Sequence, residues 1–147
     1  MIDQSVDILL VEDDQGDIDL MEEALKPNAG RINLQVVKDG VKALAYLRKE
    51  GIYQHARQPA LILLDLNLPR KDGREVLSEI KKDERLKHIP VIVLTTSDAA
   101  IDIIKAYSLG ANCYVTKPVG LNQFMEVMKR IQEFWLSTAE LPNSRYP

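Results

Sequence analysis

Cysteine is almost absent from the chain: Cys113 is the only one among 147 residues. No disulfide can therefore form within the chain, and such sparing use of cysteine is typical of a reducing compartment. Long apolar runs are also missing, since the longest, residues 60–64 and 91–94, are far too short to span a bilayer. The first residues lack the basic and then apolar pattern of a signal sequence. We therefore expect a cytoplasmic protein that does not associate with membranes.

An excess of positive charge is missing as well. The formal net charge is −3 and the pI is about 5.4, so the sequence does not predict binding to nucleic acid. It also contains no obvious polybasic segment that would bind an anionic membrane. A length of 147 residues suits one domain. We expect a single domain over residues 1–147, with its core in residues 6–136 and a polar, loosely ordered tail in residues 137–147.

Five short, largely apolar runs are present, and each of them ends in polar residues. The predicted strands are Val6–Val11, Leu34–Val37, Leu61–Leu64, Pro90–Thr96 and Cys113–Thr116. Runs of this kind are typical of strands that are buried on both faces of a parallel sheet. A segment with apolar residues at helical spacing follows each run.

The five predicted helices carry these spaced apolar residues. They are the segments from Ile18 to Leu25, Val41 to Leu47, Val76 to Ile80, Ile101 to Tyr107, and Leu121 to about Trp135 or Leu136. Asp14, Asp39 and Asp72 are predicted N-caps, and Ser97 or Asp98 is expected to cap the fourth helix. Strict alternation of strand and helix predicts an α/β fold, a doubly wound five-stranded parallel sheet of the (βα)5 type.

Chemically active side chains lie at the ends of four of the predicted strands. They are Glu12, Asp13, Asp65, Thr95 and Lys117. Because the carboxyl ends of parallel strands meet at one edge of the sheet, we expect these side chains to lie close together. Three adjacent carboxylates repel one another unless a cation lies among them, and Mg²⁺ prefers such oxygen ligands. A hydroxyl and an ammonium group beside them suit phosphoryl transfer to a carboxylate, with Asp65 as the first residue to test.

A purely structural interpretation exists for each of these residues taken singly. Carboxylates at strand ends are often only helix caps, as predicted for Asp14 and Asp72. Thr95 alone would be an ordinary strand residue, and Lys117 alone would usually be a solvated surface amine. Their joint occurrence at the ends of four buried strands favours the functional interpretation.

Several segments closely resemble the receiver domain of two-component response regulators, in the same order along the chain. They are Leu10–Asp14, Leu64–Pro69, Asp72–Gly73, Val93–Thr95 and Tyr114–Pro118. The resemblance covers roughly residues 6–136. The longer loop at residues 51–59, the segment Leu66–Pro69 and the ending Phe134-Trp135 most resemble regulators that are paired with cyanobacterial and bacterial phytochromes.

The resemblance implies a flavodoxin-like fold with strand order 2-1-3-4-5. It implies that Asp65 accepts a phosphoryl group from a phosphohistidine on a sensor histidine kinase of the phytochrome type. Asp13 and Asp65 would bind Mg²⁺ directly. Glu12 would act on the metal mainly through water, and the backbone carbonyl of Asn67 would complete the protein ligands. The chain would then be a phosphoacceptor signalling protein that assists its own phosphorylation and dephosphorylation, rather than an enzyme.

The resemblance also implies how phosphorylation would be reported. Thr95 would hydrogen-bond a phosphoryl oxygen, and Lys117 would pair with the phosphoryl charge. Tyr114 would be the switch aromatic, turning inward when Thr95 moves toward the phosphoryl group. The Lys117–Pro118 peptide bond would be cis, which only X–Pro bonds adopt at modest cost. A partly buried tyrosine with a hydrated hydroxyl is the structural alternative for Tyr114.

The last predicted helix has an apolar arc wider than a simple core-facing stripe. Leu121, Phe124, Met125, Met128, Ile131 and Trp135 make the expected stripe, and Val127 and Phe134 lie beside it. Phe134 and Trp135 either cover the bottom of the core or form a two-fold dimer with the fourth helix and fifth strand. The family resemblance favours the homodimer. We expect output from this surface, because no further domain follows the last helix.

Three competing functions share part of this pattern. A Mg²⁺-dependent phosphatase with an aspartyl nucleophile needs a second acid two residues later, where this chain has Asn67. A flavodoxin needs a hydroxyl- or glycine-rich loop for phosphate after the first strand, where Glu12 and Asp13 would repel it. A receiver-like domain that is not phosphorylated would lack one of the five strand-end residues, and none is missing. The receiver interpretation is therefore preferred.

Overall fold

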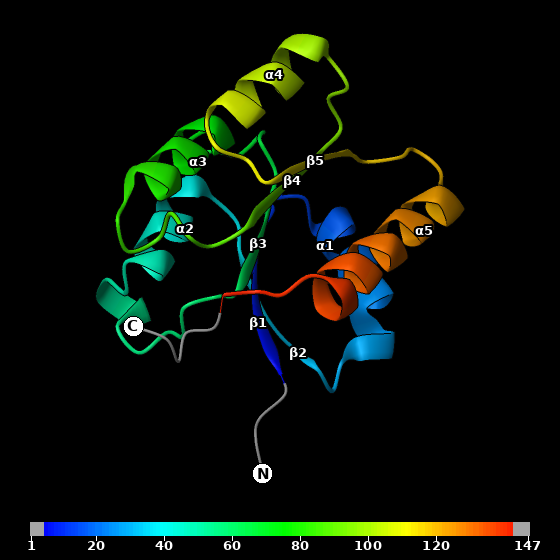
Figure 1. Ribbon diagram of the computed structural model, residues 1–147, viewed down its shortest axis with the longest axis horizontal. Helices are drawn as coiled ribbons and strands as arrows, with labels where there is room; N and C mark the ends of the chain where they lie inside the picture. Colours follow the sequence, from blue (N-terminus) through cyan, green and yellow to red (C-terminus); the bar gives the residue numbers. More distant parts are fainter. Residues whose placement is uncertain (1–4, 143–147) are drawn as a thin grey trace.

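In the computed structural model, which describes residues 5–142, five parallel strands form one sheet in the order β2-β1-β3-β4-β5 (Figure 1). This confirms the fold class and the strand order that the resemblance implied. The strands are β1 (Val6–Val11), β2 (Ile32–Val37), β3 (Leu61–Leu64), β4 (Val91–Thr95) and β5 (Cys113–Thr116). The α-helices are α1 (Gln15–Leu25), α2 (Gly40–Leu47), α3 (Gly73–Lys82), α4 (Ala100–Ser108) and α5 (Leu121–Gln132). Within residues 5–142, no helix has the length and apolar character needed to cross a membrane.

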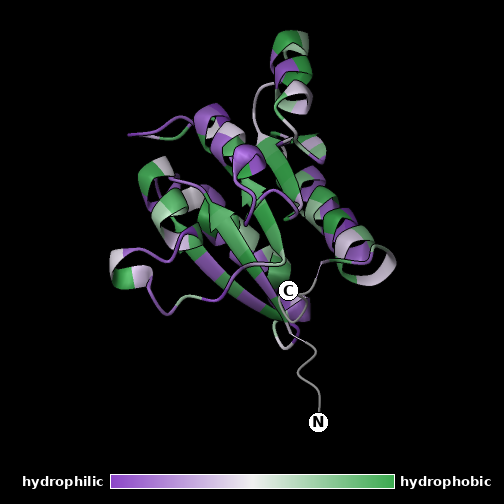
Figure 2. Ribbon diagram, turned by 60° about the vertical axis from the view of Figure 1, so that its left-hand side comes forward, coloured by the Kyte–Doolittle hydropathy of each residue, from purple (hydrophilic) through white to green (hydrophobic). Residues whose placement is uncertain are grey.

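Helices cover both faces of the sheet. Helices α1 and α5 pack on one face, and α2, α3 and α4 lie on the other (Figure 1). Successive residues of β3 alternate between the two cores: Leu61 and Leu63 join the α1/α5 side, whereas Ile62 and Leu64 join the other. Burying one such side chain contributes roughly 1.5–3 kcal/mol. The inner strands β3 and β4 are buried throughout, whereas the edge strand β2 alternates between hydrophobic and polar residues (Figure 2).

Most helix starts follow the predicted capping chemistry. The side chains of Asp14, Asp39 and Asp72 accept hydrogen bonds from backbone N–H groups in the first turns of α1, α2 and α3. The predicted cap of α4 is wrong, because its N-cap is Ala99 and no side chain caps it. Ser97 instead donates its hydroxyl to Asp102 at 2.6 Å. The Ser97 hydroxyl therefore contacts a side chain in the first turn of α4 and the N–H of Ala99, and the free N–H groups of that turn are left without a side-chain cap.

The end of the chain differs from the sequence-based expectation. The α-helix α5 ends at Gln132, and a π-helix, η3 (Glu133–Thr138), follows it directly. Part of the predicted tail is therefore helical, and residues 143–147 of that tail lie outside the described residues. Leu121, expected on the stripe facing the sheet, is exposed because it is the first residue of α5.

Two short 3-10 helices complete the described structure. They are η1 (Lys26–Asn28), which follows α1, and η2 (Gly51–Tyr53), which lies in the loop before β3. Strand β2 begins two residues earlier than predicted, at Ile32, because Ile32 pairs with Val6 of β1 and is buried. All six residues of β2 pair with β1, and β2 is an edge strand of the sheet.

Candidate functional site

Asp65 is held rigidly just beyond β3. Its backbone N–H donates to Val11 O at 3.0 Å, which extends the pairing of β1 and β3 past the last strand residue. Its carboxylate Oδ1 accepts the backbone N–H of Asn67 at 3.0 Å. Gly73 allows α3 to start against this turn, since a Cβ there would lie 2.3 Å from Asp65 O. The Asp65 side chain is thus fixed with one oxygen directed away from its own turn.

Lys117 lies at the centre of the candidate site. Its buried ammonium donates to Asp65 Oδ2 at 2.9 Å, to Asp17 Oδ2 at 2.8 Å, and to a carboxylate oxygen of Glu12. Lys117 follows β5, and its backbone is held against β4, because its N–H donates to Thr95 O at 2.6 Å. The structure therefore brings the predicted residues Glu12, Asp65 and Lys117 into direct contact across the ends of β1, β3 and β5.

The predicted cis peptide at Lys117–Pro118 is wrong, because no cis peptide bond occurs within the described residues. An X–Pro bond favours trans by about 0.5–1 kcal/mol unless surrounding contacts select the other isomer. With the trans bond, Lys117 already makes its backbone contact to Thr95 and its side-chain contacts to the carboxylates. No described contact therefore calls for the less favourable isomer.

Three carboxylates of the predicted metal site come together. Glu12, Asp13 and Asp65 each offer an oxygen, and these oxygens lie within 4.8 Å of one another. Glu12 and Asp65 are buried, whereas Asp13 is exposed at the mouth of the cluster. Clustered carboxylate oxygens with a solvent-accessible side are the donor set of a hard divalent cation. The residues present therefore fit a divalent cation.

The ionisation of the cluster reflects its crowding. Burial raises the pKa of Glu12 to about 8, and the neighbouring Asp65 adds to the rise. Burial also opposes ionisation of Asp65, but hydrogen bonding with Glu12, the Asn67 N–H and Lys117 together lower the pKa of Asp65. Burial disfavours the Lys117 ammonium, yet its hydrogen bonds to Asp17, Glu12 and Asp65 raise the pKa of Lys117. Without a metal, the cluster thus favours the protonated form of Glu12 and the charged form of Lys117.

Glu12 predicts a pH dependence for the metal-free protein. Its pKa of about 8 exceeds its ordinary value of 4.5, so between these values the folded chain binds more protons than the unfolded chain. Stability falls with rising pH wherever the folded state binds more protons. We therefore expect the Glu12 contribution to the free energy of unfolding to decline from pH 4.5 to about 8.

Urea denaturation in EDTA, compared between the wild type and Glu12→Gln, measures this contribution. The wild type should lose more stability than Glu12→Gln as the pH rises, and added Mg²⁺ should flatten its decline by favouring the ionised carboxylate. Parallel pH profiles for the two proteins in EDTA would contradict the shift.

Thr95 has an unusual hydrogen-bonding state. It is fully buried at the end of β4, between the strands that lead to Asp65 and Lys117. Within residues 5–142, its Oγ1 is the one buried side-chain nitrogen or oxygen with no hydrogen-bond partner. A buried hydroxyl without a partner costs about 1–3 kcal/mol. Such a group needs an explanation, and a ligand oxygen that arrives at the strand ends supplies one.

Tyr114 is attached to the loop that follows Thr95. Its hydroxyl donates to Ser97 O at 2.8 Å. Ser97 in turn donates to Asp102 of α4, which also accepts from Arg74 of α3 at 3.0 Å. The predicted switch aromatic is thus half-buried and tied to the β4–α4 loop, together with side chains from two helices. Any movement of that loop must change the hydrogen bond of Tyr114.

Asp17 belongs to the site and was missed by the sequence analysis. It lies in the first turn of α1 and contacts Lys117, whereas the predicted site was confined to the strand ends. No local pattern sets Asp17 apart from the other acidic residues near the start of α1, because its contact with Lys117 joins segments that are 100 residues apart in the sequence.

Phe134 and Trp135 lie away from the acidic cluster, in η3 beyond α5. Their rings contact each other edge to face, with centroids 5.2 Å apart. Trp135 packs against the α1/α5 core, whereas Phe134 is 51% exposed. Ile101 and Ile104 of α4 are also exposed.

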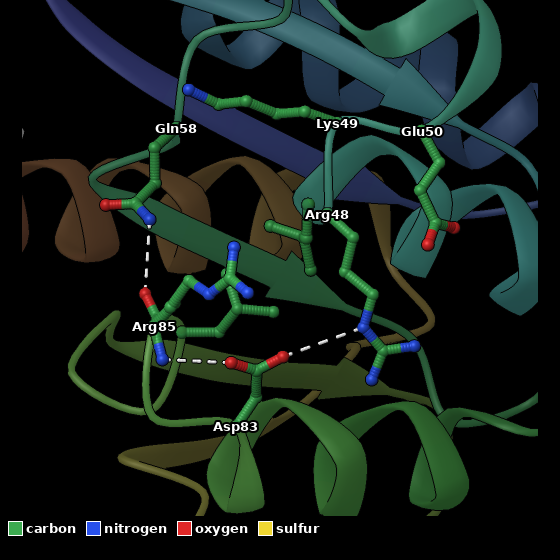
Figure 3. Close-up of a pocket in the computed structure, with 8 residues that line it drawn as sticks. Arg48, Lys49, Glu50, Gln58, Asp83 and Arg85 are labelled. Atoms are coloured by element: carbon green, nitrogen blue, oxygen red, sulfur yellow. Dashed lines mark hydrogen bonds and ion pairs between the residues drawn. The ribbon is translucent and has the colours of Figure 1, made fainter.

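A separate groove of about 380 Å³ lies at the other end of the sheet (Figure 3). Its walls come from the connections that precede β3 and β4, and hence from the amino ends of the strands. Arg48 pairs with Asp83 there at 3.6 Å, and Gln58 donates to Arg85 O at 3.2 Å. The groove contains none of the predicted site residues and serves as an ion-paired junction between α2 and the α3–β4 connection.

Comparisons with known proteins agree with this architecture. The family model of the response regulator receiver domain matches residues 8–129 of the chain. Response regulator Rcp1 of Synechocystis sp. is 49% identical over 135 residues, which is 92% of each protein. The family match covers four of the strands completely, β1 from its third residue onward, and the whole acidic cluster.

Two solved structures are similar throughout. The phosphorylated cyanobacterial phytochrome response regulator RcpA is 54% identical, with a TM-score of 0.92 over 95% of this chain and 99% of RcpA. The Mn²⁺-bound form of response regulator Rcp1 is 48% identical, with a TM-score of 0.91 over 94% of this chain and 99% of that structure.

Proposed function

Because the chain belongs to the response regulator receiver domain family, we propose that Asp65 accepts a phosphoryl group from a phosphohistidine on its sensor histidine kinase. The observation that carries this proposal is the contact of Lys117 with both Asp65 and Glu12. It supplies a nucleophilic carboxylate, an anion-binding ammonium group and the acidic oxygens of a cation site in one place. The buried hydroxyl of Thr95 adds a hydrogen-bond donor for a phosphoryl oxygen.

The transfer itself needs little covalent chemistry from the protein. A carboxylate oxygen of Asp65 attacks phosphorus, the new P–O bond forms as the P–N bond to the histidine breaks, and the imidazole leaves with the electron pair. Phosphoryl transfer depends mainly on positioning and on stabilisation of charge. Lys117 pairs with the equatorial oxygens, and Asn67 N–H keeps the Asp65 carboxylate in place.

Mg²⁺ is the cation proposed for the acidic cluster. It would supply positive charge beside the phosphoryl oxygens, with Asp13 and Asp65 as direct protein ligands. The backbone carbonyl of Asn67 would be a third ligand, and Glu12 would act mainly through water. The donor set consists of oxygen atoms only, which suits Mg²⁺ and Mn²⁺ alike, and Mg²⁺ is the usual partner of transferred phosphoryl groups.

Thr95 and Tyr114 are proposed to report the modification. A phosphoryl group brings nearly two negative charges and three acceptor oxygens. Thr95 would donate its unpartnered hydroxyl to one of them, and the β4–α4 loop would follow. The hydrogen bond from Tyr114 to Ser97 O would then break or move with that loop. The surface of α4, β5 and α5 would change as a result.

Labelling with a small phosphodonor tests the phosphoacceptor role. With Mg²⁺ and acetyl phosphate, the intact mass of the wild-type protein should rise by one phosphoryl group per chain. EDTA should remove the labelling, because the three carboxylates would then repel the incoming phosphoryl group. Labelling that persists in EDTA would contradict the proposed part of the cation.

The proposed kinase is of the phytochrome type, and its cytoplasmic domains would place this chain in the cytoplasm. RcpA is a phytochrome response regulator and is 54% identical to this chain, and this similarity supports the pairing. A phosphorylated phytochrome kinase should transfer its label to this chain faster than a histidine kinase with another input domain does. Equal rates would overturn the phytochrome pairing while leaving the phosphoacceptor role in place.

A homodimer through α4, β5 and α5 is also proposed. Phe134 and the α4 residues Ile101 and Ile104 supply exposed apolar area near this surface. Light scattering after chromatography should give a dimer for the wild type and a smaller dimer fraction for Phe134→Ala. Ile52→Ala is the matched control, because Ile52 is similarly apolar and exposed but lies on η2. A dimer fraction that responds equally to both changes would overturn the proposed interface.

A further inference from the structure

The inference concerns Asp17 and rests on the proposed function of Asp65. Asp17 Oδ2 accepts a hydrogen bond from Lys117 Nζ at 2.8 Å, and its side chain is 28% exposed. The resemblance to receiver domains assigned no role to this residue. The contact crosses from the first turn of α1 to the end of β5, over 100 residues of sequence.

The ammonium of Lys117 has no spare donor in this state. A lysine ammonium carries three N–H groups, and Lys117 Nζ contacts three carboxylates, those of Glu12, Asp17 and Asp65. Each contact uses one donor. Any new acceptor for Lys117 must therefore displace one of the three carboxylates.

Phosphorylation of Asp65 changes two of these three contacts. Glu12 and Asp65 both belong to the cluster that fits a cation, so a cation would share their oxygens with Lys117 and weaken both contacts. Asp65 also loses its full negative charge when it becomes an acyl phosphate. Among the residues that the structure describes, Asp17 is the partner of Lys117 outside the cation cluster, so a cation would not compete for its contact.

We propose that Asp17 is a positioning residue for phosphoryl transfer. It holds the Lys117 ammonium in place while the contacts of Lys117 with Glu12 and Asp65 weaken. One N–H group of Lys117 is then directed at the incoming phosphoryl oxygen. Asp17 touches neither the phosphoryl group nor the cation and acts through Lys117. Hydrogen bonds between charged groups are the strong ones, so the loss of this anchor should be visible in the rate.

The test is the rate of labelling as a function of acetyl phosphate concentration at saturating Mg²⁺. Asp17→Asn should lower the rate constant at saturating phosphodonor about tenfold, in line with the loss of one charge-assisted hydrogen bond. The half-saturating concentration should stay unchanged, because Asp17 does not contact the donor. Asp17→Glu keeps the carboxylate and should recover most of the rate.

Asp19→Asn is the matched control. It removes the same charge from the same helix, but Asp19 is exposed and, among the described residues, its side chain accepts from Gln15 at 2.8 Å and does not contact Lys117. Its labelling rate should equal that of the wild type. If Asp17→Asn does not fold, Asp17→Ser provides the same comparison.

Two results would overturn the inference. One is a wild-type rate constant for Asp17→Asn, whether or not its melting temperature falls, because that is what a purely structural ion pair predicts. The other is an equal loss of rate in Asp17→Asn and Asp17→Glu. Failure of the proposed function is a different outcome, since the wild-type protein itself would then carry no phosphoryl group on Asp65.

Discussion

Asp65→Asn should abolish phosphorylation by acetyl phosphate while leaving the protein folded. The amide oxygen of asparagine is a poor nucleophile and carries no negative charge to attack phosphorus or to bind a cation. The fold should survive, because Lys117 keeps its contacts with Glu12 and Asp17. Intact-mass measurement of both proteins after incubation with Mg²⁺ and acetyl phosphate gives the comparison.

Asp72→Asn is the matched control for this experiment. Asp72 lies on the loop after Asp65, but its carboxylate caps α3 by accepting the N–H of Arg74 at 3.0 Å. Asparagine is an equally good N-cap. This variant should therefore be labelled like the wild type. Equal labelling of Asp65→Asn and the wild type would refute the assignment of Asp65.

Lys117→Met should have the largest effect on stability. The change leaves the buried carboxylates of Glu12 and Asp65 without their cation. Removal of one partner from a buried ion pair typically costs about 3–5 kcal/mol. We expect a loss of that order at pH 8 in EDTA, together with a loss of phosphorylation, because the ammonium that pairs with the phosphoryl oxygens is gone.

The loss of stability in Lys117→Met should depend on pH and on Mg²⁺ if unpaired carboxylates cause it. At pH 5 the destabilisation should be smaller, because the carboxylates of the variant can take up protons. Mg²⁺ should also restore part of the stability by replacing the missing positive charge. Lys117→Arg, which keeps the charge but not the shape, should retain most of the stability. Urea denaturation of the wild type, Lys117→Met and Lys117→Arg measures these differences in the free energy of unfolding. A Lys117→Met protein as stable as the wild type at pH 8 would contradict the stabilising role of Lys117 in the buried cluster.

The sequence was sufficient to predict the central part of the fold. Four apolar residues in a row, Leu61–Leu64, have no helical period and can be stable only where both faces of a strand are covered. Aspartates at the helix starts revealed their capping roles through local hydrogen bonding alone. The start of α4 and the π-helix after α5 were not predictable in this way. Ser97 bonds to Asp102 and Tyr114, and these contacts depend on the tertiary structure.

The sequence also predicted part of the candidate site. Glu12, Asp65 and Lys117 could be placed together, because the ends of parallel strands share one edge of the sheet. Asp17 could not, since its contact joins the first turn of α1 to Lys117, which follows β5, and this depends on the tertiary structure. The isomer of the Lys117–Pro118 bond and the partnerless hydroxyl of Thr95 likewise follow from the surrounding contacts and not from local sequence. The roles carried over from the receiver family remain predictions for these residues.

The most direct measurement is to identify the residue that carries the phosphoryl group. Borohydride reduces an aspartyl phosphate to homoserine, so reduction of the labelled protein followed by peptide mass spectrometry marks the acceptor permanently. Homoserine should appear at position 65 and at no other aspartate, and no conversion should occur when Mg²⁺ is withheld. Homoserine at position 13 or 17, or an unmodified Asp65 in a labelled protein, would contradict the assignment of Asp65.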